Sequence, residues 1–431
     1  MRQIKLTYNE AVIDFEEALK WLIKIAYVVF LYYAMYSRAE GLLWLSGGMT
    51  AALMSAGIFF LSIVYLFYLK ENFVVSQLVF TILIFFALVA LTPIISALIF
   101  DISTGVIMRF IMEVGVVVFI FLATYNFIRA KIITPKFFIY ALAFLGFLAA
   151  LTILQSLIGA THVWRVRTSI GGVNYIGTTI GMSTIAWIMI LYSNTFDERG
   201  NKKFNKLKMV AFILTLFAMV LTGTRSAAIG FIVGLSALIF FGFRKKNLKK
   251  YLLISGGCVG FVVLIFVMNF DVSRLLDRYT MDQLVRMANI RFTIYALAVT
   301  DLTMLEFLFG RPDLYIFSSG MDGSRLVNTH NILLSFIRYH GIFVFTFFVM
   351  LLFAIFFNYL KLYKKNKNLP LFRFTESSIV VLLAMAIVYT MFSGGRPTRA
   401  FSLFIALGYF AGYFELLKNV ESVEEYKKLI L

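Results

Sequence analysis

Long apolar runs alternate with short polar segments along almost the whole chain. A helix needs about 20 apolar residues to cross the roughly 30 Å of hydrocarbon in a bilayer. Twelve runs come close to that length: 21–37, 48–69, 73–92, 107–128, 137–159, 170–192, 209–222, 226–243, 251–269, 341–360, 376–394 and 400–416. The pattern predicts an all-α polytopic membrane protein with about 12 transmembrane helices, in which residues 1–431 form a single membrane domain.

The basic residues between these runs predict how the chain is oriented. If the N-terminus is cytoplasmic, 25 of the 40 Lys and Arg residues lie inside and 13 lie outside, as the positive-inside rule requires. Both termini are then cytoplasmic, and the longest polar segment, 271–340, is an extracytoplasmic loop between spans 9 and 10. The inside set holds 20 Lys and 5 Arg, whereas all 13 outside residues are Arg.

This Arg-only outer surface indicates an anionic ligand. Arg binds phosphate oxygens in pairs through a planar fork, whereas Lys is a strongly hydrated point charge. A phosphate or pyrophosphate ligand would account for the choice of Arg. Two alternatives stay open: Arg suits the boundary between water and lipid, and it can pair with the seven acidic residues of the 271–340 loop.

Composition excludes several other classes of protein. A hydrophobic share of 61% and a mean hydropathy of +0.89 exclude an ordinary soluble enzyme. The net charge of +18 does not indicate nucleic acid, because most Lys residues form short clusters beside apolar runs. The single cysteine, Cys258, excludes disulfides within the chain and cysteine-based metal sites.

Two short motifs place Arg side chains at the outer surface. The hairpin between runs 209–222 and 226–243 turns at Thr224-Arg225, so the Arg225 guanidinium must reach the outer surface or a water-filled cavity. Ser226, Gly230 and Gly234 follow at four-residue spacing, which lets a neighbouring helix approach closely. Within the long loop, the apolar spacing over Arg291–Gly310 predicts a helix on or partly in the outer surface, headed by Arg291.

A third motif, Asn328-Thr329-His330-Asn331, contains the candidate base. Asn328 or Thr329 can cap a helix that begins at His330, and the helix dipole would then keep the imidazole neutral and able to accept a proton. The same backbone N–H groups could bind an anion. The other two histidines, His162 and His340, are expected to be structural.

In this order and topology, the three motifs resemble the O-antigen ligase and polymerase family of bacterial membrane glycosyltransferases. The resemblance covers residues 170–414, with Thr222–Ala227, Arg291–Gly310 and His330-Asn331 in place of the family motifs. It implies three catalytic residues: His330, Arg225 and Arg291. It also underlies five predicted substrate-binding residues: Arg167, Asn174, Asn331, Arg338 and Arg399. Val173 stands where the family usually has a proline, and Arg165 competes with Arg167 for its role.

The resemblance implies a polysaccharide polymerase at the outer face of the bacterial cytoplasmic (inner) membrane. It would transfer a glycan from undecaprenyl diphosphate to the hydroxyl of an acceptor glycan in O-antigen, capsule or exopolysaccharide synthesis. Flippase and chain-length regulator proteins would be its partners. No cofactor or metal is expected, because the sequence has no Asp-x-Asp pair, phosphate-binding Gly-rich loop or zinc-spaced His pair.

Three alternatives remain. A ligase would transfer the finished glycan to a lipid A core or another acceptor; a polymerase is preferred because the first five spans show no feature tied to such a core. A lipid-linked oligosaccharide flippase or transporter would need ionisable groups in its spans. Those present are few, and Arg109 and Glu113, four residues apart, are expected to pair with each other. A receptor or structural protein would leave the Arg asymmetry unexplained.

Overall fold

The computed structural model describes residues 6–8, 11–13, 15–35, 47–68, 76–155, 173–192, 202–222, 224–242, 280–313, 316–318, 325–327, 331–366, 381–390 and 401–418. These residues are predominantly helical. The helices are α1 (Phe15–Met35), α2 (Gly47–Tyr68), α3 (Gln77–Phe100), α4 (Thr104–Arg129), α5 (Pro135–Gln155), α6 (Val173–Tyr192), α7 (Lys202–Leu221), α8 (Arg225–Gly242), α11 (Met281–Thr300), α12 (Met304–Phe309), α13 (Ile332–Asn366) and α15 (Phe401–Lys418). A further helical segment covers Val381–Thr390.

Several of these helices are suited to a membrane by their length and composition. Among the described residues, five can cross a bilayer: Gln77–Phe100, Thr104–Arg129, Pro135–Gln155, Ile332–Leu362 and Phe401–Lys418. Four shorter apolar helices are Ala52–Tyr68, Ile176–Leu191, Ser226–Leu238 and Val381–Thr390. The chain is therefore a helical membrane protein. Every predicted run except 251–269, which lies outside the described residues, coincides with a helix, but the number of spans stays a prediction.

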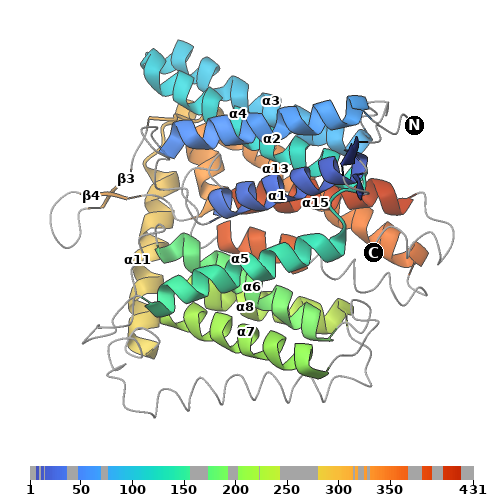
Figure 1. Ribbon diagram of the computed structural model, residues 1–431. Helices are drawn as coiled ribbons and strands as arrows, with labels where there is room; N and C mark the ends of the chain where they lie inside the picture. The colour runs from blue at the N-terminus through green and yellow to red at the C-terminus, as the bar shows by residue number, and fades with distance from the viewer. Residues whose placement is uncertain are drawn as a thin grey trace.

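From α1 to α8, consecutive helices run in opposite directions (Figure 1). At one end α3 passes into α4 and α7 into α8, and α11 lies across this end, roughly perpendicular to the other helices (Figure 1). We call it the α11 end. At the opposite end lie the α4–α5 turn and a small antiparallel hairpin of β1 (Leu6–Tyr8) and β2 (Ala11–Ile13) (Figure 1). The directions of α1 to α8 agree with the predicted alternation; the alternation over all twelve runs, and which end faces the cytoplasm, stay predictions.

Close helix packing in the α6–α8 region depends on small residues. A Cβ atom on Gly181 of α6 would collide with the hydroxyl oxygen of Tyr389, and one on Gly230 of α8 would collide with its ring. A Cβ on Gly234 would collide with the sulfur of Met385. Tyr389 and Met385 are four residues apart in the Val381–Thr390 segment, so one face of that segment lies against both helices. The prediction that Gly230 and Gly234 admit a neighbouring helix is confirmed.

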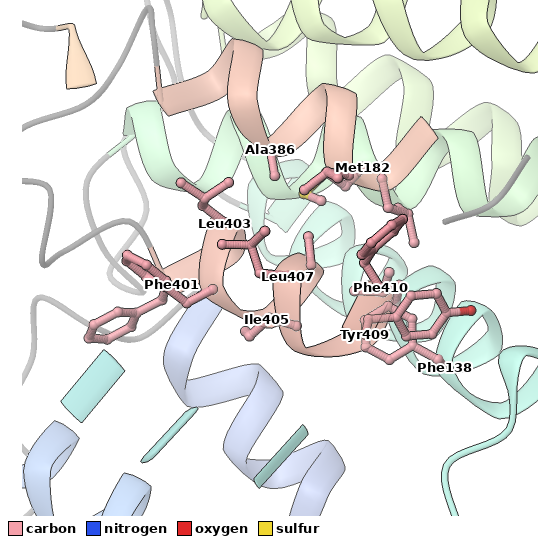
Figure 2. Packing of buried hydrophobic residues seen from close by; sticks show 14 of the residues in the cluster. Phe138, Met182, Ala386, Phe401, Leu403, Ile405, Leu407, Tyr409 and Phe410 are labelled. Carbon is pink, nitrogen blue, oxygen red and sulfur yellow. The ribbon is translucent and has the colours of Figure 1, made fainter. Parts of the chain in front are cut away.

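A large apolar cluster joins α15 to its neighbours. Figure 2 shows residues of α15 gathered with residues of α5, α6 and the Val381–Thr390 segment, including Leu403, Leu407, Phe410, Phe138, Met182 and Ala386. The ring centroids of Phe138 and Tyr409 lie 4.2 Å apart. On another face of α15, a Cβ on Gly408 would lie 2.7 Å from the backbone oxygen of Phe121, so α15 is also pressed against α4.

The long polar segment differs from its predicted form in one respect. The predicted helix Arg291–Gly310 is two helices, because α11 begins ten residues earlier at Met281 and the chain turns at Asp301–Thr303 before α12. Thr303 caps α12 in a reciprocal capping box with Glu306, which favours a new helix start over continuation of α11. Arg291 is consequently in the middle of α11 rather than at the head of a helix. Gly310 ends α12 at φ +74°, as predicted.

Beyond α12, the chain forms a short antiparallel hairpin of β3 (Ile316–Ser318) and β4 (Arg325–Val327), which the sequence pattern did not indicate. Its two strands project beyond α11 in Figure 1. The hairpin keeps the chain at the α11 end until α13 begins at Ile332. α13 is broken at Gly341, whose φ of +80° separates a first helix, 332–340, from the membrane-length helix that follows.

Candidate active site

The predicted site residues that the structure describes lie at the α11 end in two groups. The first group is built around the α7–α8 turn. A Cβ on Gly177 of α6 would lie 2.6 Å from Thr224 Oγ1 and 2.8 Å from Thr222 Oγ1, so α6 touches this turn directly. Arg225 follows Thr224 as the first residue of α8, and Asn174 precedes Gly177 by three residues. The backbone of the two predicted site residues is thus brought to one corner of the bundle.

The two threonines of the α7–α8 turn, Thr222 and Thr224, are buried and hold the turn through their hydrogen bonds. Thr222 donates from Oγ1 to the carbonyl of Met219 at 2.7 Å, and the same oxygen accepts from the backbone N–H of Thr224 at 3.4 Å. The backbone N–H of Ala227 donates to the Thr224 carbonyl at 3.0 Å, so Thr224 stands at the start of α8. Arg225 is the first residue of α8, at the helix end whose backbone N–H groups and dipole favour an anion.

The second group joins α11 to the 332–340 helix. Ile294 and Ala298 of α11 are buried against Leu334, and Arg291 lies on the same face of α11 at helical spacing. The Arg338 side chain is only 2% exposed, and its Nη1 donates to the carbonyl of Ala298 at 3.3 Å. Arg338, predicted to bind substrate, thus also ties the two helices together, and its contact with substrate stays a prediction.

Asn331 is the cap of the 332–340 helix. Its Oδ1 accepts from the backbone N–H groups of Leu333 at 2.9 Å and Leu334 at 3.4 Å, which is the bonding of an N-cap side chain. The predicted caps, Asn328 and Thr329, are wrong, because the helix begins two residues later than expected. His330 itself lies outside the described residues, but the inference that a helix dipole beginning at His330 keeps its ring neutral does not hold in that form, because the helix begins at Ile332.

The end of α12 packs against the break in α13 through a contact between Gly310 and Gly341, which we call the hinge. Gly310 and Gly341 pack backbone to backbone, since a Cβ on Gly310 would collide with the N atoms of His340 and Gly341, and one on Gly341 with the carbonyl of Leu308. The N–H of Arg311 donates to the carbonyl of Arg338 at 2.8 Å. Two carbonyls of the hinge, Phe309 and Gly310, accept hydrogen bonds from Ser96 Oγ of α3 at 3.2 and 2.9 Å.

Arg311 is held by two acidic residues of the loop. Its Nη1 lies 2.9 Å from Glu306 Oε1 and its Nε lies 3.0 Å from Asp313 Oδ1. Hydrogen bonds to Asp313 and Glu306 together raise the pKa of Arg311, although burial acts against them. For Glu306 burial acts to raise the pKa, but hydrogen bonds from Thr303 and Arg311 outweigh it and leave the pKa lowered. For Arg311, pairing with loop acids therefore accounts for the presence of an Arg at the predicted outer surface.

His340 is buried at the junction of three helices. Its Nδ1 lies 2.7 Å from Oγ1 of Thr92 in α3. Its ring packs edge-on against the ring of Phe110 in α4, with the two ring centroids 5.9 Å apart. Thr92 also donates to the Val89 carbonyl at 3.1 Å, so we assign the Nδ1 proton to the bond with Thr92. Among the described residues, His340 Nε2 has no hydrogen-bond partner. The fixed, buried ring agrees with the expected structural role.

The sequence pattern did not indicate that the α11 end contains Thr92 and Ser96 or an ion pair between Glu306 and Arg311. The Thr303-x-x-Glu306 spacing is a capping-box signal that could have indicated the start of α12. Three predicted site residues, His330, Arg167 and Arg399, lie outside the described residues, as do Arg165 and His162. Within the described ranges, no group of three or more His, Cys, Asp or Glu residues could hold a metal ion.

Comparison with known proteins gives no independent assignment. No protein-family model matches the chain, and no curated protein matches it.

Proposed function

We propose that the protein is a membrane glycosyltransferase that polymerises polysaccharide at the outer face of the bacterial cytoplasmic membrane. Its donor would be a glycan linked to undecaprenyl diphosphate, and its acceptor would be a sugar hydroxyl of another glycan. The observation that carries the proposal is the gathering of Asn174, Arg225, Arg291, Asn331 and Arg338 at the α11 end, from segments far apart in the sequence. The motif resemblance points to the same residues from the sequence alone.

In the proposed reaction, the acceptor hydroxyl oxygen attacks the anomeric carbon of the donor glycan. The bond from that carbon to the diphosphate oxygen breaks, and the lipid diphosphate leaves with the bonding electron pair. His330 accepts the proton of the attacking hydroxyl, a role that typically contributes about 100- to 10,000-fold in rate. Arg225 and Arg291 stabilise the charge that develops on the diphosphate, and removing one such donor typically costs about 100- to 1,000-fold.

The outer-surface Arg residues divide into different roles in this proposal. Arg311 is already neutralised by Glu306 and Asp313, and Arg338 is buried, so neither is offered as a main diphosphate ligand. Arg225 begins a helix and Arg291 lies on the inward face of α11. Because Arg side chains would supply the positive charge, the reaction is expected to proceed in the presence of a metal chelator.

The glycan profile of a deletion strain tests this proposal. The strain would be complemented with wild type, His330→Ala, Arg291→Ala or the control Arg311→Ala, each checked for membrane expression. A ladder of long chains with wild type and Arg311→Ala, and a single repeat unit with the other two variants, is the expected result. Long lipid-linked chains that never reach their acceptor would indicate a ligase instead. Full activity of both His330→Ala and Arg291→Ala would exclude the proposed site.

A second candidate, transport of a lipid-linked oligosaccharide, is favoured by one observation. His340 is buried among membrane helices against Phe110 of α4, the residue that follows Arg109, and Arg109 pairs with Glu113 at 3.6 Å. The predicted Arg109–Glu113 pair is confirmed, and His340 is a third ionisable group, on a helix that contacts α4. Ionisable groups inside membrane helices often line transport paths. If the protein were a transporter, Glu113→Gln would abolish glycan export, whereas the polymerase proposal expects chain length to survive that change.

A further inference from the structure

α11 carries three distinct faces along its length. One face is buried against the 332–340 helix through Ile294 and Ala298. A second face is exposed and polar, and its residues follow helical spacing: Asp282, Arg286, Asn289, Thr293 and Thr300. The third face is exposed and apolar. It begins with Met281, Val285 and Phe292, at positions i, i+4 and i+11, which lie above one another on an α-helix.

Exposed apolar side chains are also present on the next helix, α12. We define the α11–α12 apolar face by Met281, Val285, Phe292, Met304 and Leu305, whose side chains are between 51% and 73% exposed. Single exposed apolar residues are common on proteins, but five of them on two successive helices are more than soluble proteins usually expose to water. Something other than bulk water therefore covers this face in the working protein.

Two observations select the covering partner. First, α11 lies across the end of the bundle, so its axis is roughly parallel to the plane of a membrane that the other helices cross (Figure 1). Second, the α12 part of the face lies next to a helix whose exposed apolar side chains must meet lipid. The ring centroids of Phe309 in α12 and Phe343 in α13 lie 6.5 Å apart. Phe343 begins a row of exposed apolar side chains on α13 that continues through Met350, Phe353 and Phe357.

We propose that the α11–α12 apolar face is embedded in the boundary between headgroups and acyl chains of the membrane leaflet at the α11 end. A helix with one apolar and one polar exposed face adopts this position because the apolar side is buried in lipid while the polar side stays in water. The buried face, meanwhile, remains packed on the 332–340 helix. The sequence pattern had indicated only a surface helix beginning at Arg291, without defining which side meets lipid.

The embedded face also has a consequence for the neighbouring polar residues. Arg286 lies one position after Val285, on the polar stripe beside the apolar one, and is exposed. A helix at the boundary holds such a side chain at the level of the lipid headgroups. α11 would therefore fix the depth of the α11 end in the bilayer, independently of any reaction performed there.

Site-directed spin labelling of the full chain tests this proposal. In a Cys258→Ala background, single cysteines replace Met281, Val285 or Phe292 on the apolar face, and Asn289 or Thr293 on the polar face of the same helix. Each protein is labelled and reconstituted into liposomes of phosphatidylethanolamine and phosphatidylglycerol. Collision rates of the label are then measured with oxygen, which concentrates in hydrocarbon, and with a nickel chelate, which stays in water. All five positions are exposed, so a label displaces no packed side chain.

The expected result is a ratio of oxygen to nickel collisions several-fold higher at the three apolar positions than at the two polar ones. Equal ratios on both faces, with free access of nickel, would overturn the proposal and leave the face in water. Strong spin–spin broadening at Phe292, removed by dilution with unlabelled protein, would also overturn it, because a second copy of the chain would then cover the face. The measurement needs no glycan substrate, so its outcome is independent of the proposed glycosyltransferase activity.

Discussion

At the scale of single residues, the α11 end depends on atoms that sequence patterns do not mark. His340 and Thr92 are 248 residues apart, yet their side chains meet at 2.7 Å. Gly310 and Gly341 touch through their backbones, although nothing in either local sequence refers to the other. Both pairs lie where the polar loop returns to the membrane. A small change at either pair should therefore alter the positions of Asn331 and Arg338, which are nearby in the chain.

The bond between His340 and Thr92 can be tested with two amides of different length. The side-chain nitrogen of Asn can take the place of Nδ1, whereas that of Gln takes the place of Nε2. Because Nδ1 makes the bond to Thr92, His340→Asn should keep the thermal unfolding temperature close to wild type. His340→Gln should lower it by an amount corresponding to about 1 kcal/mol, the usual net value of one hydrogen bond. The opposite order of the two variants would show that Nε2 is the important atom.

The two glycines of the hinge should tolerate no side chain. At Gly341, φ is +80° and ψ is 172°, a conformation that costs an L residue roughly 1–3 kcal/mol, and a Cβ would also collide with the carbonyl of Leu308. Gly341→Ala should therefore lower the unfolding temperature markedly. Gly115→Ala in α4 is the matched control, because no atom lies within 4 Å of its new Cβ and Ala favours helix by about 0.5–1 kcal/mol. Equal stability of the two variants would refute this role of the hinge glycines.

At the scale of elements, α12 shows how a short helix is held in place. Its six residues are too few for a stable isolated helix. The capping box of Thr303 and Glu306, the ion pairs of Arg311 and the contact with Gly341 supply what helix propensity lacks. The first two of these could be suspected from sequence spacing, but the third required the fold.

Glu306 should make the stability of this element depend on pH. Its folded-state pKa is lowered from the usual 4.5, so the carboxylate contributes stability that is present above 4.5 and is lost as pH falls through the folded pKa. Thermal unfolding followed from neutral to acid pH should show this loss, and Glu306→Gln should remove part of it. Asp313→Asn is a control that keeps the Glu306–Arg311 contact. An unchanged pH profile in Glu306→Gln would contradict the role given to this carboxylate.

At the scale of the whole molecule, the alternating helices separate an end with α11 from an end with the α4–α5 turn. Asp282 and Lys131 are exposed, one at each end. A single cysteine that replaces either residue in a Cys258→Ala background would show which side of the membrane that end faces. In intact cells, a membrane-impermeant thiol reagent should label the cysteine at 282 and should reach the one at 131 only after permeabilisation. This result follows from the distribution of Lys and Arg under the positive-inside rule. The reverse pattern would place the predicted catalytic loop in the cytoplasm.

The sequence alone determined the properties that depend on local composition. Apolar runs predicted the positions of the membrane helices, and the Gly230 and Gly234 spacing predicted a close helix contact, because both depend on residues near one another in the chain. Gly310 was identified correctly as the end of a helix for the same reason. The start of the helix after Asn331 was misplaced by two residues, since several neighbouring side chains could serve as its cap and only one does.

Tertiary structure decided everything that depends on which segments meet. It joined Arg338 to α11, seated the loop on Thr92 and Ser96 of α3, and brought α6 against the turn before Arg225. It also divided the outer Arg residues by environment, pairing Arg311 with acids while burying Arg338. Such distinctions arise from packing between distant parts of the chain, and a one-dimensional pattern carries no information about those contacts.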